Sequence, residues 1–372
     1  MRILMISKAL VVGAYHKKIS EMAALGMKID LLIPTTWGNQ RPEITNASEY
    51  AIHRLPISFS GKNHFHFYHG LSSLVDSISP DILHIDEEPY SLVTYQTMRI
   101  AKRLKIKSLF FTWQNINKRY PYPFSSIERH NYKNANIAIA GNQEAKCSLQ
   151  KKGFTKDIFV IPQFGVDTSV FLKQNVSSVK GNIFHSTDTK VIGYIGRLVE
   201  EKGIMILLDV FSKLDRNFNL LLIGDGPLKQ QILKAGKQYG IADRLTIISH
   251  VPSKEIPMYM NCIDCLILPS LTKSNWKEQF GRVLIEAMSC EVPVIGSDSG
   301  EIPNVIGDAG LLFKEGNSVD LREKIGKIFC NQRFREEMGR RGRERVENNF
   351  TQKHIAAQTL GVYQKLQQGL ND

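Results

Sequence analysis

Short apolar runs alternate along this chain with longer stretches whose apolar residues recur at helical spacing. Each run ends at a turn rich in small residues, which is the pattern of buried strands joined by helices. The alternation predicts an α/β fold with two Rossmann-like domains, each a doubly wound parallel sheet that binds ligands beyond the carboxyl ends of its strands. The expected strands are MRILMIS, KIDLLIP, PDILHID, SLFFTW and ANIAIAGN in the N-terminal half, and VIGYIG, LLLIG, CLILPS and residues 292–295 in the C-terminal half.

Two domains are expected because 372 residues exceed what one hydrophobic core usually organises. We place the first domain at residues 1–168 and the second at residues 169–351, with a linker near residues 167–190. Helices are predicted after Gly13 and over the tail, residues 352–372. The apolar residues that define these two helices are Ile19, Met22, Ala23 and Leu25 in the first, and Ile355, Leu360, Tyr363 and Leu366 in the second.

The segment EQFGRVLIEAM, residues 278–288, carries two glutamates on either side of a Phe-Gly pair. Apolar residues recur at helical spacing after Gly281, so a helix is predicted to begin there. A helix N-terminus has unpaired N–H groups and a partial positive charge, and it can hold phosphate or sugar oxygens. Glu278 and Glu286 could then bind two hydroxylated parts of one ligand. The alternative is an ordinary amphipathic helix with two solvated glutamates.

A second segment, VIGYIGRLVEEKGI at residues 191–204, is predicted as a buried strand, a short loop and the start of a helix. The loop carries Arg197 and Lys202. A planar guanidinium and an ammonium group on one loop can together neutralise a diphosphate. Two solvated basic side chains are the alternative interpretation.

Four segments in this order and spacing, GRLVEEKG, IGDGP, EQFGRVLIEAM and VPVIGSDSGEIP, resemble the family-4 retaining glycosyltransferases of GT-B fold. The resemblance is dense in the C-terminal half and weaker in the N-terminal half. It implies two Rossmann-like domains that face a central cleft, with the nucleotide-sugar donor on the C-terminal domain and the acceptor on the N-terminal one. It also implies that the last helix packs back on the first domain, and that the cleft closes when the donor binds.

The resemblance assigns roles to individual residues of this chain. Arg197 and Lys202 would hold the donor diphosphate, Glu278 would contact the donor sugar, and these three are the expected catalytic residues. Glu286 would bind the ribose hydroxyls, and backbone groups near Val251 would meet the nucleobase. The family usually has two glycines in its first loop, of which only Gly13 is present here. The expected donor-binding residues are Gly13, Gly196, Arg197, Lys202, Val251, Glu278, Gln279, Phe280, Gly281, Arg282, Val283 and Glu286.

The chain departs from the family after the strand SLFFTW, where many relatives have a histidine near the reacting sugar. Gln114 and Asn115 follow that strand here. An amide can position a hydroxyl but cannot act as an acid or base near neutral pH, so we assign no general base. In the mechanism ascribed to this family, the leaving phosphate takes the acceptor's proton. Asp86, Glu87 and Glu88 form an acidic triplet at the end of the strand PDILHID. Asp86 and Glu87 are the other acceptor-side candidates, and a solvated acidic loop is the alternative.

Neither a metal site nor a cofactor is expected, since the nucleotide sugar is a substrate. His64, His66 and His69 have a spacing that metal ligands can have, but no carboxylate or cysteine lies nearby in sequence. We therefore expect these histidines on a helix or loop surface. Cys262 and Cys265 lack a second cysteine pair and are expected to be buried structural thiols.

The chain is basic, with a formal net charge of +12. Residues 1–170 contain 21 Lys and Arg against 13 Asp and Glu, a net of +8, and the densest basic segment is RIAKRLKIK, residues 99–107. Such a face would attract anionic phospholipids or a lipid-diphosphate acceptor, whereas a solvated helix face is the alternative. No apolar run reaches the roughly 18 residues of a spanning helix. We expect a cytoplasmic protein, at the inner face of the plasma membrane where the basic half contacts lipid, and no nucleic-acid partner.

The preferred functional hypothesis is a metal-independent retaining hexosyltransferase. It would move a sugar from a UDP- or GDP-sugar to a saccharide or lipid-linked hydroxyl, in cell-surface polysaccharide or glycolipid synthesis. A nucleotide-sugar epimerase is a second hypothesis, although it would need acid–base side chains that Gln114 does not supply. A catalytically silent nucleotide-sugar-binding protein is the third.

Overall fold

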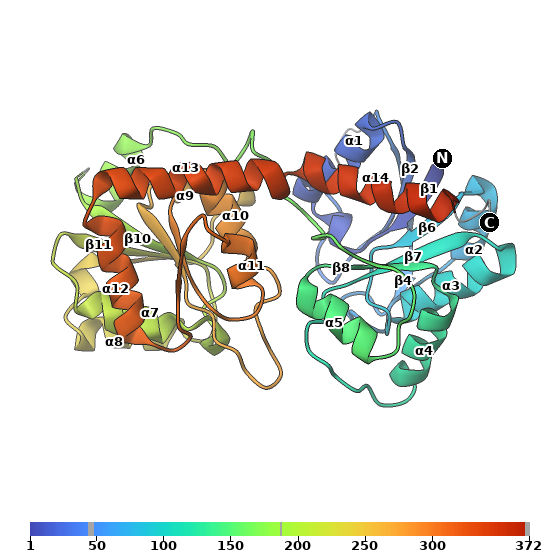
Figure 1. The fold of residues 1–372 in the computed structure, drawn as a ribbon, viewed down its shortest axis with the longest axis horizontal. Helices are drawn as coiled ribbons and strands as arrows, with labels where there is room; N and C mark the ends of the chain where they lie inside the picture. Colours follow the sequence, from blue (N-terminus) through green and yellow to red (C-terminus); the bar gives the residue numbers. More distant parts are fainter. Residues whose placement is uncertain (44–47, 187, 369–372) are drawn as a thin grey trace. The chain divides into compact units, whose positions relative to one another are not determined.

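The structure, a computed structural model of the protein, describes residues 1–43, 48–186 and 188–368. The chain divides into two compact units (Figure 1). The first unit consists of Met1–Gly165 with Gln352–Asp372, and the second of Val166–Thr351. The sequence-based boundary was placed between residues 168 and 169. None of the described helices is long and apolar enough to cross a membrane.

The first unit is built on a seven-stranded parallel sheet in the order β3-β2-β1-β6-β7-β8-β9. Its strands are β1 (Arg2–Ile6), β2 (Lys28–Pro34), β3 (Ala51–Leu55), β6 (Ile82–Ile85), β7 (Lys107–Thr112), β8 (Ile137–Ala140) and β9 (Ile158–Val160), and β4 (Ile57–Ser58) pairs separately with β5 (Phe67–Tyr68). Its α-helices are α1 (Lys17–Ala24), α2 (Leu71–Ile78), α3 (Leu92–Leu104), α4 (Phe124–Asn134), α5 (Gln143–Lys151) and α14 (Gln352–Gln368), with 3-10 turns η1 (Ala9–Val11) and η2 (Gly13–His16).

Successive side chains of a β-strand point to opposite faces of the sheet, so they pack into hydrophobic cores on the two sides. Ile3 and Met5 of β1 pack with residues of α1 and α14, whereas Leu4 and Ile6 pack with residues of α2 and α3. Both faces of the sheet are therefore covered, which explains why its central strands are continuous apolar runs. Leu25 was expected on the buried face of the first helix, but it follows the end of α1 and is exposed.

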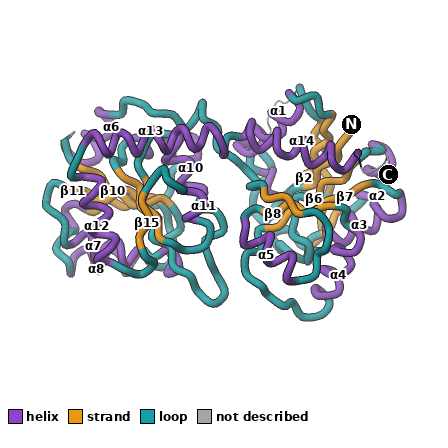
Figure 2. Tube along the Cα trace, in the orientation of Figure 1, coloured by secondary structure: helices purple, strands orange, loops and turns teal. Residues whose placement is uncertain are grey.

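The second unit contains a six-stranded parallel sheet in the order β12-β11-β10-β13-β14-β15, and Figure 2 shows its strands lying among helices. The strands are β10 (Lys190–Ile195), β11 (Phe218–Ile223), β12 (Leu245–Ile248), β13 (Cys265–Leu268), β14 (Val294–Ser297) and β15 (Leu311–Phe313). The helices are α6 (Ser177–Phe184), α7 (Ile204–Ser212), α8 (Lys229–Gln238), α9 (Ile256–Asn261), α10 (Arg282–Ser289), α11 (Ile302–Ile306), α12 (Ser318–Phe329) and α13 (Gln332–Asn349), with 3-10 turns η3 (Glu200–Lys202), η4 (Ala242–Arg244) and η5 (Ser253–Glu255).

Two expectations about this unit are wrong in detail. The strand predicted at residues 292–295 begins two residues later, at Val294, because Pro293 has no N–H to donate to a neighbouring strand. The segment predicted as a linker, residues 167–190, contains α6 and is part of the second unit. Lys180 of α6 forms an ion pair with Asp264, 2.7 Å apart, which attaches this helix to the end of the unit's sheet.

Candidate active site

The second unit has a topological switch point between β10 and β13. These strands are neighbours, yet β11 and β12 extend the sheet on one side, and β14 and β15 on the other. The loops that leave β10 and β13 diverge at such a point and create a crevice at the carboxyl ends of the strands, where α/β proteins bind ligands. Arg197 follows β10 and Ser270 follows β13, so both lie at this end of the sheet.

Lys202 and Glu278 meet directly at this end of the sheet. The Lys202 Nζ lies 2.5 Å from Glu278 Oε2, and Ser270 Oγ donates a hydrogen bond of 2.8 Å to the same carboxylate oxygen. Glu278 is buried, and the Lys202 ammonium also lies 5.0 Å from the centre of the Trp276 ring. The structure thus joins two of the three residues predicted to be catalytic, although they are far apart in the sequence.

The loop that carries Arg197 and Lys202 packs against the end of β13. Gly203 closes this loop with φ of +66°, and a Cβ at this position would lie 1.9 Å from the carbonyl oxygen of Pro269. The position therefore requires glycine on both counts. Arg197 does not join the contact between Lys202 and Glu278. Its side chain is 68% exposed, and its guanidinium lies 3.4 Å from Glu201.

Glu286 lies within α10, as the sequence predicted, but its carboxylate forms an ion pair with Arg282, one turn earlier, at 3.0 Å. Burial raises the pKa of Glu286, and the Arg282 charge opposes that rise. Gly281 precedes the helix with φ of +73°, and a Cβ there would lie 2.9 Å from Leu268 of β13. This close approach holds the N-terminus of α10, with its first-turn amides, against the end of the sheet.

The other expected donor-binding residues are more dispersed. Gly196 and Val283 flank the residues described above, in the loop after β10 and in the first turn of α10. Val251 follows β12, two strands away from β10. Gln279 is exposed, whereas Phe280 is buried with its ring 5.8 Å from that of Phe350, so only the Phe280 backbone could face a ligand.

Gly13 belongs to the first unit, where its N–H donates to the Glu43 carboxylate at 2.7 Å. The Gly13 amide, which was predicted to bind the donor, thus already binds a carboxylate. The role assigned to Gly13 stays a prediction, and a donor phosphate at this amide would have to displace Glu43.

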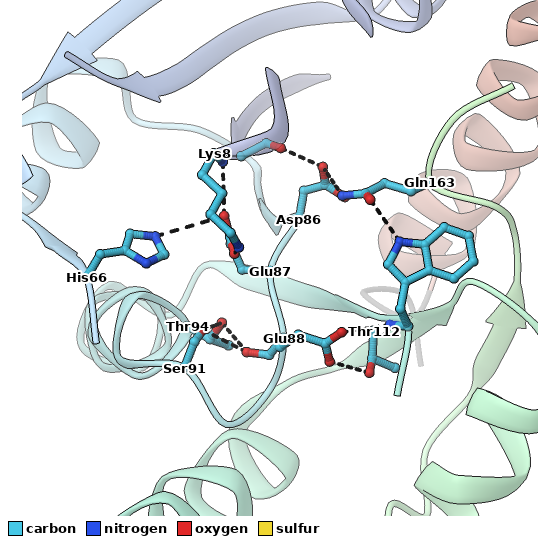
Figure 3. A network of polar contacts seen from close by, with 11 residues as sticks. Lys8, His66, Asp86, Glu87, Glu88, Ser91, Thr94, Thr112 and Gln163 are labelled. Atoms are coloured by element: carbon cyan, nitrogen blue, oxygen red, sulfur yellow. Dashed lines mark hydrogen bonds and ion pairs between the residues drawn. The ribbon is translucent and has the colours of Figure 1, made fainter. Parts of the chain in front are cut away.

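The first unit has its own switch point, between β1 and β6. Polar side chains collect at the carboxyl ends of these strands, as Figure 3 shows. Asp86, which follows β6, accepts hydrogen bonds from Ser7 Oγ at 2.7 Å and from Gln163 Nε2 at 2.9 Å. Lys18 is also buried nearby, and its charge opposes the rise that burial causes in the pKa of Asp86. The alternative of a solvated acidic loop is therefore wrong, because Asp86 and Glu87 are both buried.

Glu87 is held by two groups of Lys8. The Lys8 backbone N–H donates to one carboxylate oxygen at 2.9 Å, and its ammonium forms an ion pair with the other. His66 Nε2 lies 3.9 Å from Glu87, and the His66 ring packs edge-on against Trp37 with centroids 4.9 Å apart. His66 was expected on a surface but is fully buried, because the chain from β4 to β5 folds it against the triplet.

The other two histidines behave differently. His69 is exposed, as predicted, with its Nε2 2.8 Å from Ser58 Oγ, and His64 is half-buried against Tyr90. Within the described ranges, no group of three or more His, Cys, Asp or Glu residues is arranged to hold a metal ion. The expectation for Cys262 and Cys265 is confirmed, since both are free and buried.

Glu88 supports the turn in which the two amide candidates lie. Its carboxylate accepts from Thr112 Oγ1 at 2.5 Å and from the Trp113 N–H at 2.9 Å. Gln114 uses both ends of its amide inside the same loop: Nε2 donates to the Ile116 carbonyl, and Oε1 accepts from the Tyr120 hydroxyl. An acceptor hydroxyl at Gln114 would therefore have to replace one of these contacts.

Asn115 is similarly engaged, because its Nδ2 donates to Glu144 at 3.3 Å. The turn after β7 is therefore built from polar groups that satisfy one another. Its two amide side chains were proposed as acceptor contacts, and that role stays a prediction.

The Glu88 carboxyl group should make stability depend on pH. Burial raises its pKa from an ordinary 4.5 to about 7, although Thr112 and Trp113 oppose the rise. Between these two values the folded protein retains a proton that the unfolded chain has released, so this group's contribution to stability falls as the pH rises through that window. The expected loss is on the order of 1–3 kcal/mol.

Urea unfolding of the wild type and of Glu88→Gln, at a pH near 4.5 and at one above 7, tests this expectation. The glutamine keeps an acceptor for the Trp113 N–H but does not titrate. The difference in the free energy of unfolding between the wild type and Glu88→Gln should change by about 1–3 kcal/mol between these two pH values. If the wild type and the variant show the same pH dependence, Glu88 does not titrate in this window.

Several residues of the two sites were not among the predicted ones. Lys8 and Ser270 each lie two residues after a strand at a switch point, and this position is a signal that the sequence contains. Gln163 bridges the Asp86 carboxylate and the Trp113 indole N–H, which lies 2.9 Å from its Oε1. No local pattern indicates that role, because Gln163 comes from a loop that is distant in sequence from both partners.

Comparison with known proteins connects this architecture to a class of enzymes. Residues 176–345 match the family model described as "Glycosyl transferases group 1". An N-acetyl-alpha-D-glucosaminyl L-malate synthase from Bacillus anthracis is 31% identical over 212 residues, which are 56% of this chain and 54% of that protein. The capsular polysaccharide biosynthesis glycosyltransferase CapM from Staphylococcus aureus is 33% identical over 182 residues, 47% of this chain and 46% of that protein. The chain thus spans about half the length of these curated relatives.

Among solved structures, a sucrose-phosphate synthase from Thermosynechococcus elongatus aligns with a TM-score of 0.76 at 19% identity, covering 99% of this chain and 100% of that one. That likeness shows the fold. The predicted resemblance to glycosyltransferases of GT-B fold is therefore confirmed, with the sequence match concentrated in the second unit.

Proposed function

We propose that this protein is a retaining glycosyltransferase that moves a hexosyl group from a UDP- or GDP-sugar to a hydroxyl of a saccharide or lipid-linked acceptor. The match of residues 176–345 to group 1 glycosyltransferases supports the transferase class. The relative named for capsular polysaccharide biosynthesis supports a role in cell-surface polysaccharide or glycolipid synthesis. We also propose that it needs no metal, and that it acts at the inner face of the plasma membrane.

One observation carries this proposal: the cluster of Lys202, Glu278 and Ser270 at the switch point of the second sheet. A buried carboxylate bonded to an ammonium and a hydroxyl can accept sugar hydroxyls while the ammonium turns to a phosphate. Arg197, exposed on the same loop as Lys202, can add a second positive charge toward a diphosphate. The Glu286 carboxylate, in the helix that begins beside this cluster, is assigned to the ribose hydroxyls.

In the proposed reaction, the bond between the anomeric carbon and the diphosphate oxygen breaks as the acceptor oxygen bonds to that carbon on the same face of the sugar. The acceptor's proton passes to the departing phosphate oxygen, so no protein base is required. Lys202 and Arg197 stabilise the negative charge that develops on the leaving diphosphate. The configuration at the anomeric carbon is retained.

A panel of UDP- and GDP-sugars, incubated with the protein with and without candidate acceptors, tests the proposal. We expect release of nucleoside diphosphate that depends on the acceptor, and a product with the donor's anomeric configuration. An isomerised donor without acceptor would identify an epimerase, and binding without turnover would identify a silent binding protein. Either result would contradict the proposal.

Glu286→Gln should weaken the binding of UDP or GDP, because a neutral amide is a poorer acceptor for two ribose hydroxyls than a carboxylate. The expected loss is about 1–2 kcal/mol, or roughly 5- to 30-fold in Kd. Isothermal titration calorimetry with the free nucleotide measures it. Glu323→Ala serves as control, because Glu323 is an exposed carboxylate on α12 in the same unit. Equal affinities of the wild type and Glu286→Gln would remove Glu286 from the donor site.

A further inference from the structure

The first unit contains a groove of about 800 Å³ that the proposed reaction does not use. It lies between the N-terminal end of α2 and one side of α3, two helices that Figure 1 shows close together, with β5 at one end. All of its lining residues belong to the first unit. The groove is therefore defined independently of the second unit.

The floor of this groove is apolar. Leu71 and Ile100 are almost fully buried in the core beneath it, and Phe67 and Leu92 are half-buried along its length. An apolar channel of this size exceeds what a phosphate ion alone would need, and it would gain from covering by hydrocarbon.

Two arginines, one turn apart on α3, line the groove beside this floor. Arg103 donates to Ser72 Oγ at 2.6 Å and lies 3.6 Å from the exposed Asp76. Within the described part of the chain, no carboxylate pairs with Arg99, whose guanidinium lies 5.8 Å from the Tyr95 ring centre. The groove therefore offers a planar cation that lacks a counter-ion.

The surrounding surface is positive as well. The pKa of His130 is lowered, first by burial and then by the charges of Lys102, Arg99 and Lys133. Three cations from α3 and α4 thus act on one imidazole. A negatively charged ligand is the natural complement of such a surface.

Phe59 adds an exposed aromatic side chain next to the groove. It is 60% exposed, and its ring centre lies 6.2 Å from that of Phe67. Its φ of +58° is in the left-handed region, where a bulky residue is an outlier. A large aromatic residue held out in this way suits a membrane interface, where aromatic rings sit at headgroup level.

We propose that this groove binds an anionic phospholipid of a membrane surface, with the phosphate held by Arg99 and Arg103 and the hydrocarbon lying along Phe67, Leu71, Leu92 and Ile100. The inference deepens the membrane association proposed above and rests on that part of the proposed function. Arginine suits this task because its planar fork matches two phosphate oxygens.

Co-sedimentation of the full chain with phosphatidylcholine vesicles, with and without phosphatidylglycerol, tests the proposal. We expect binding to the anionic vesicles and weak binding to the neutral ones. Arg99→Ala with Arg103→Ala should weaken the binding by about 30-fold, from roughly 1 kcal/mol for each basic residue at an anionic surface. The matched control is Lys28→Ala with Lys353→Ala, which removes the same charge from exposed positions of the first unit that do not line the groove.

Leu92→Gln provides a test of the apolar floor. It removes hydrocarbon contact at the start of α3 and should weaken vesicle binding by about tenfold. Binding of soluble glycerol phosphate, which has no hydrocarbon, should be much weaker than vesicle binding and should not respond to this variant. Phosphate bound as tightly as vesicles would show that the site takes free phosphate and would overturn the lipid assignment.

Two further results would also overturn the proposal. Equal losses for the arginine pair and the lysine pair would show a diffuse electrostatic surface instead of a groove, and no binding to anionic vesicles would show no lipid site. Titration of the same variants with UDP or GDP keeps this test separate from the proposed transfer. Unchanged nucleotide affinity with lost vesicle binding supports the groove, whatever the outcome of the donor panel.

Discussion

Arg197→Ala is expected to reduce kcat/KM for sugar transfer by roughly 30- to 1,000-fold, equivalent to about 2–4 kcal/mol of transition-state stabilisation. The guanidinium stands on the loop after β10, 68% exposed, with Glu201 at 3.4 Å as its carboxylate neighbour. Such an exposed ion pair contributes little to folding, so the free energy of unfolding should change by less than about 0.5 kcal/mol. The loss would therefore be almost purely functional.

Arg216→Ala is the matched control for this experiment. Arg216 belongs to the same unit, is 86% exposed and also forms an ion pair at 3.4 Å, with Asp243. The variant removes the same charge from the other end of the parallel sheet, because Arg216 precedes β11 whereas Arg197 follows β10. Initial rates and urea unfolding of both variants give the comparison. If Arg197→Ala keeps wild-type turnover, or if both variants lose it equally, Arg197 is not a leaving-group residue.

The sequence predicted the architecture well where one periodicity dominates. The apolar runs around Ile3, Ile29, Leu220 and Leu266 are central strands covered on both faces, so that burial alone defines them. The edge strands β3, β12 and β15 were missed. Their residues are mostly only partly buried, and His53 and Arg54 interrupt β3, so that it has no clear apolar run.

The proximity of Lys202 and Glu278 was predictable because both residues are close in sequence to the turns that position them. Gly203 follows Lys202 at the start of α7, Gly281 follows Glu278 shortly before α10, and a parallel sheet brings such turns to one edge. The sequence could not show that Glu278 binds Lys202 directly. Nor could it show that Glu286 turns toward Arg282, because those contacts depend on side-chain conformation.

The acidic triplet shows where sequence reasoning fails. Charged residues after a strand are usually solvated, and nothing in the local sequence distinguishes Asp86 and Glu87 from that norm. Their burial results from Lys8, Lys18 and Gln163, which come from three other segments and supply charge and hydrogen bonds. His66 is buried for a different reason, because the chain between β4 and β5 places its ring 3.9 Å from Glu87 and edge-on against Trp37.

Lys202→Met should abolish turnover and destabilise the second unit at the same time. The variant leaves the buried Glu278 carboxylate without its ammonium partner, which lies 2.5 Å away, while Ser270 Oγ still donates to the same carboxylate. Removing one member of a buried ion pair costs about 3 kcal/mol or more, because an uncompensated charge stays in the interior. Urea unfolding and initial rates of the single variant measure both losses.

The double variant Lys202→Met with Glu278→Gln separates structure from function. It removes both charges and keeps an oxygen that can accept from Ser270, so the free energy of unfolding should return to within about 1 kcal/mol of the wild type. Turnover should stay abolished, because neither the cation for the diphosphate nor the carboxylate for the sugar is present. A double variant that regains turnover together with stability would make the pair a structural support. A double variant as unstable as Lys202→Met would show instead that the two charges are not coupled.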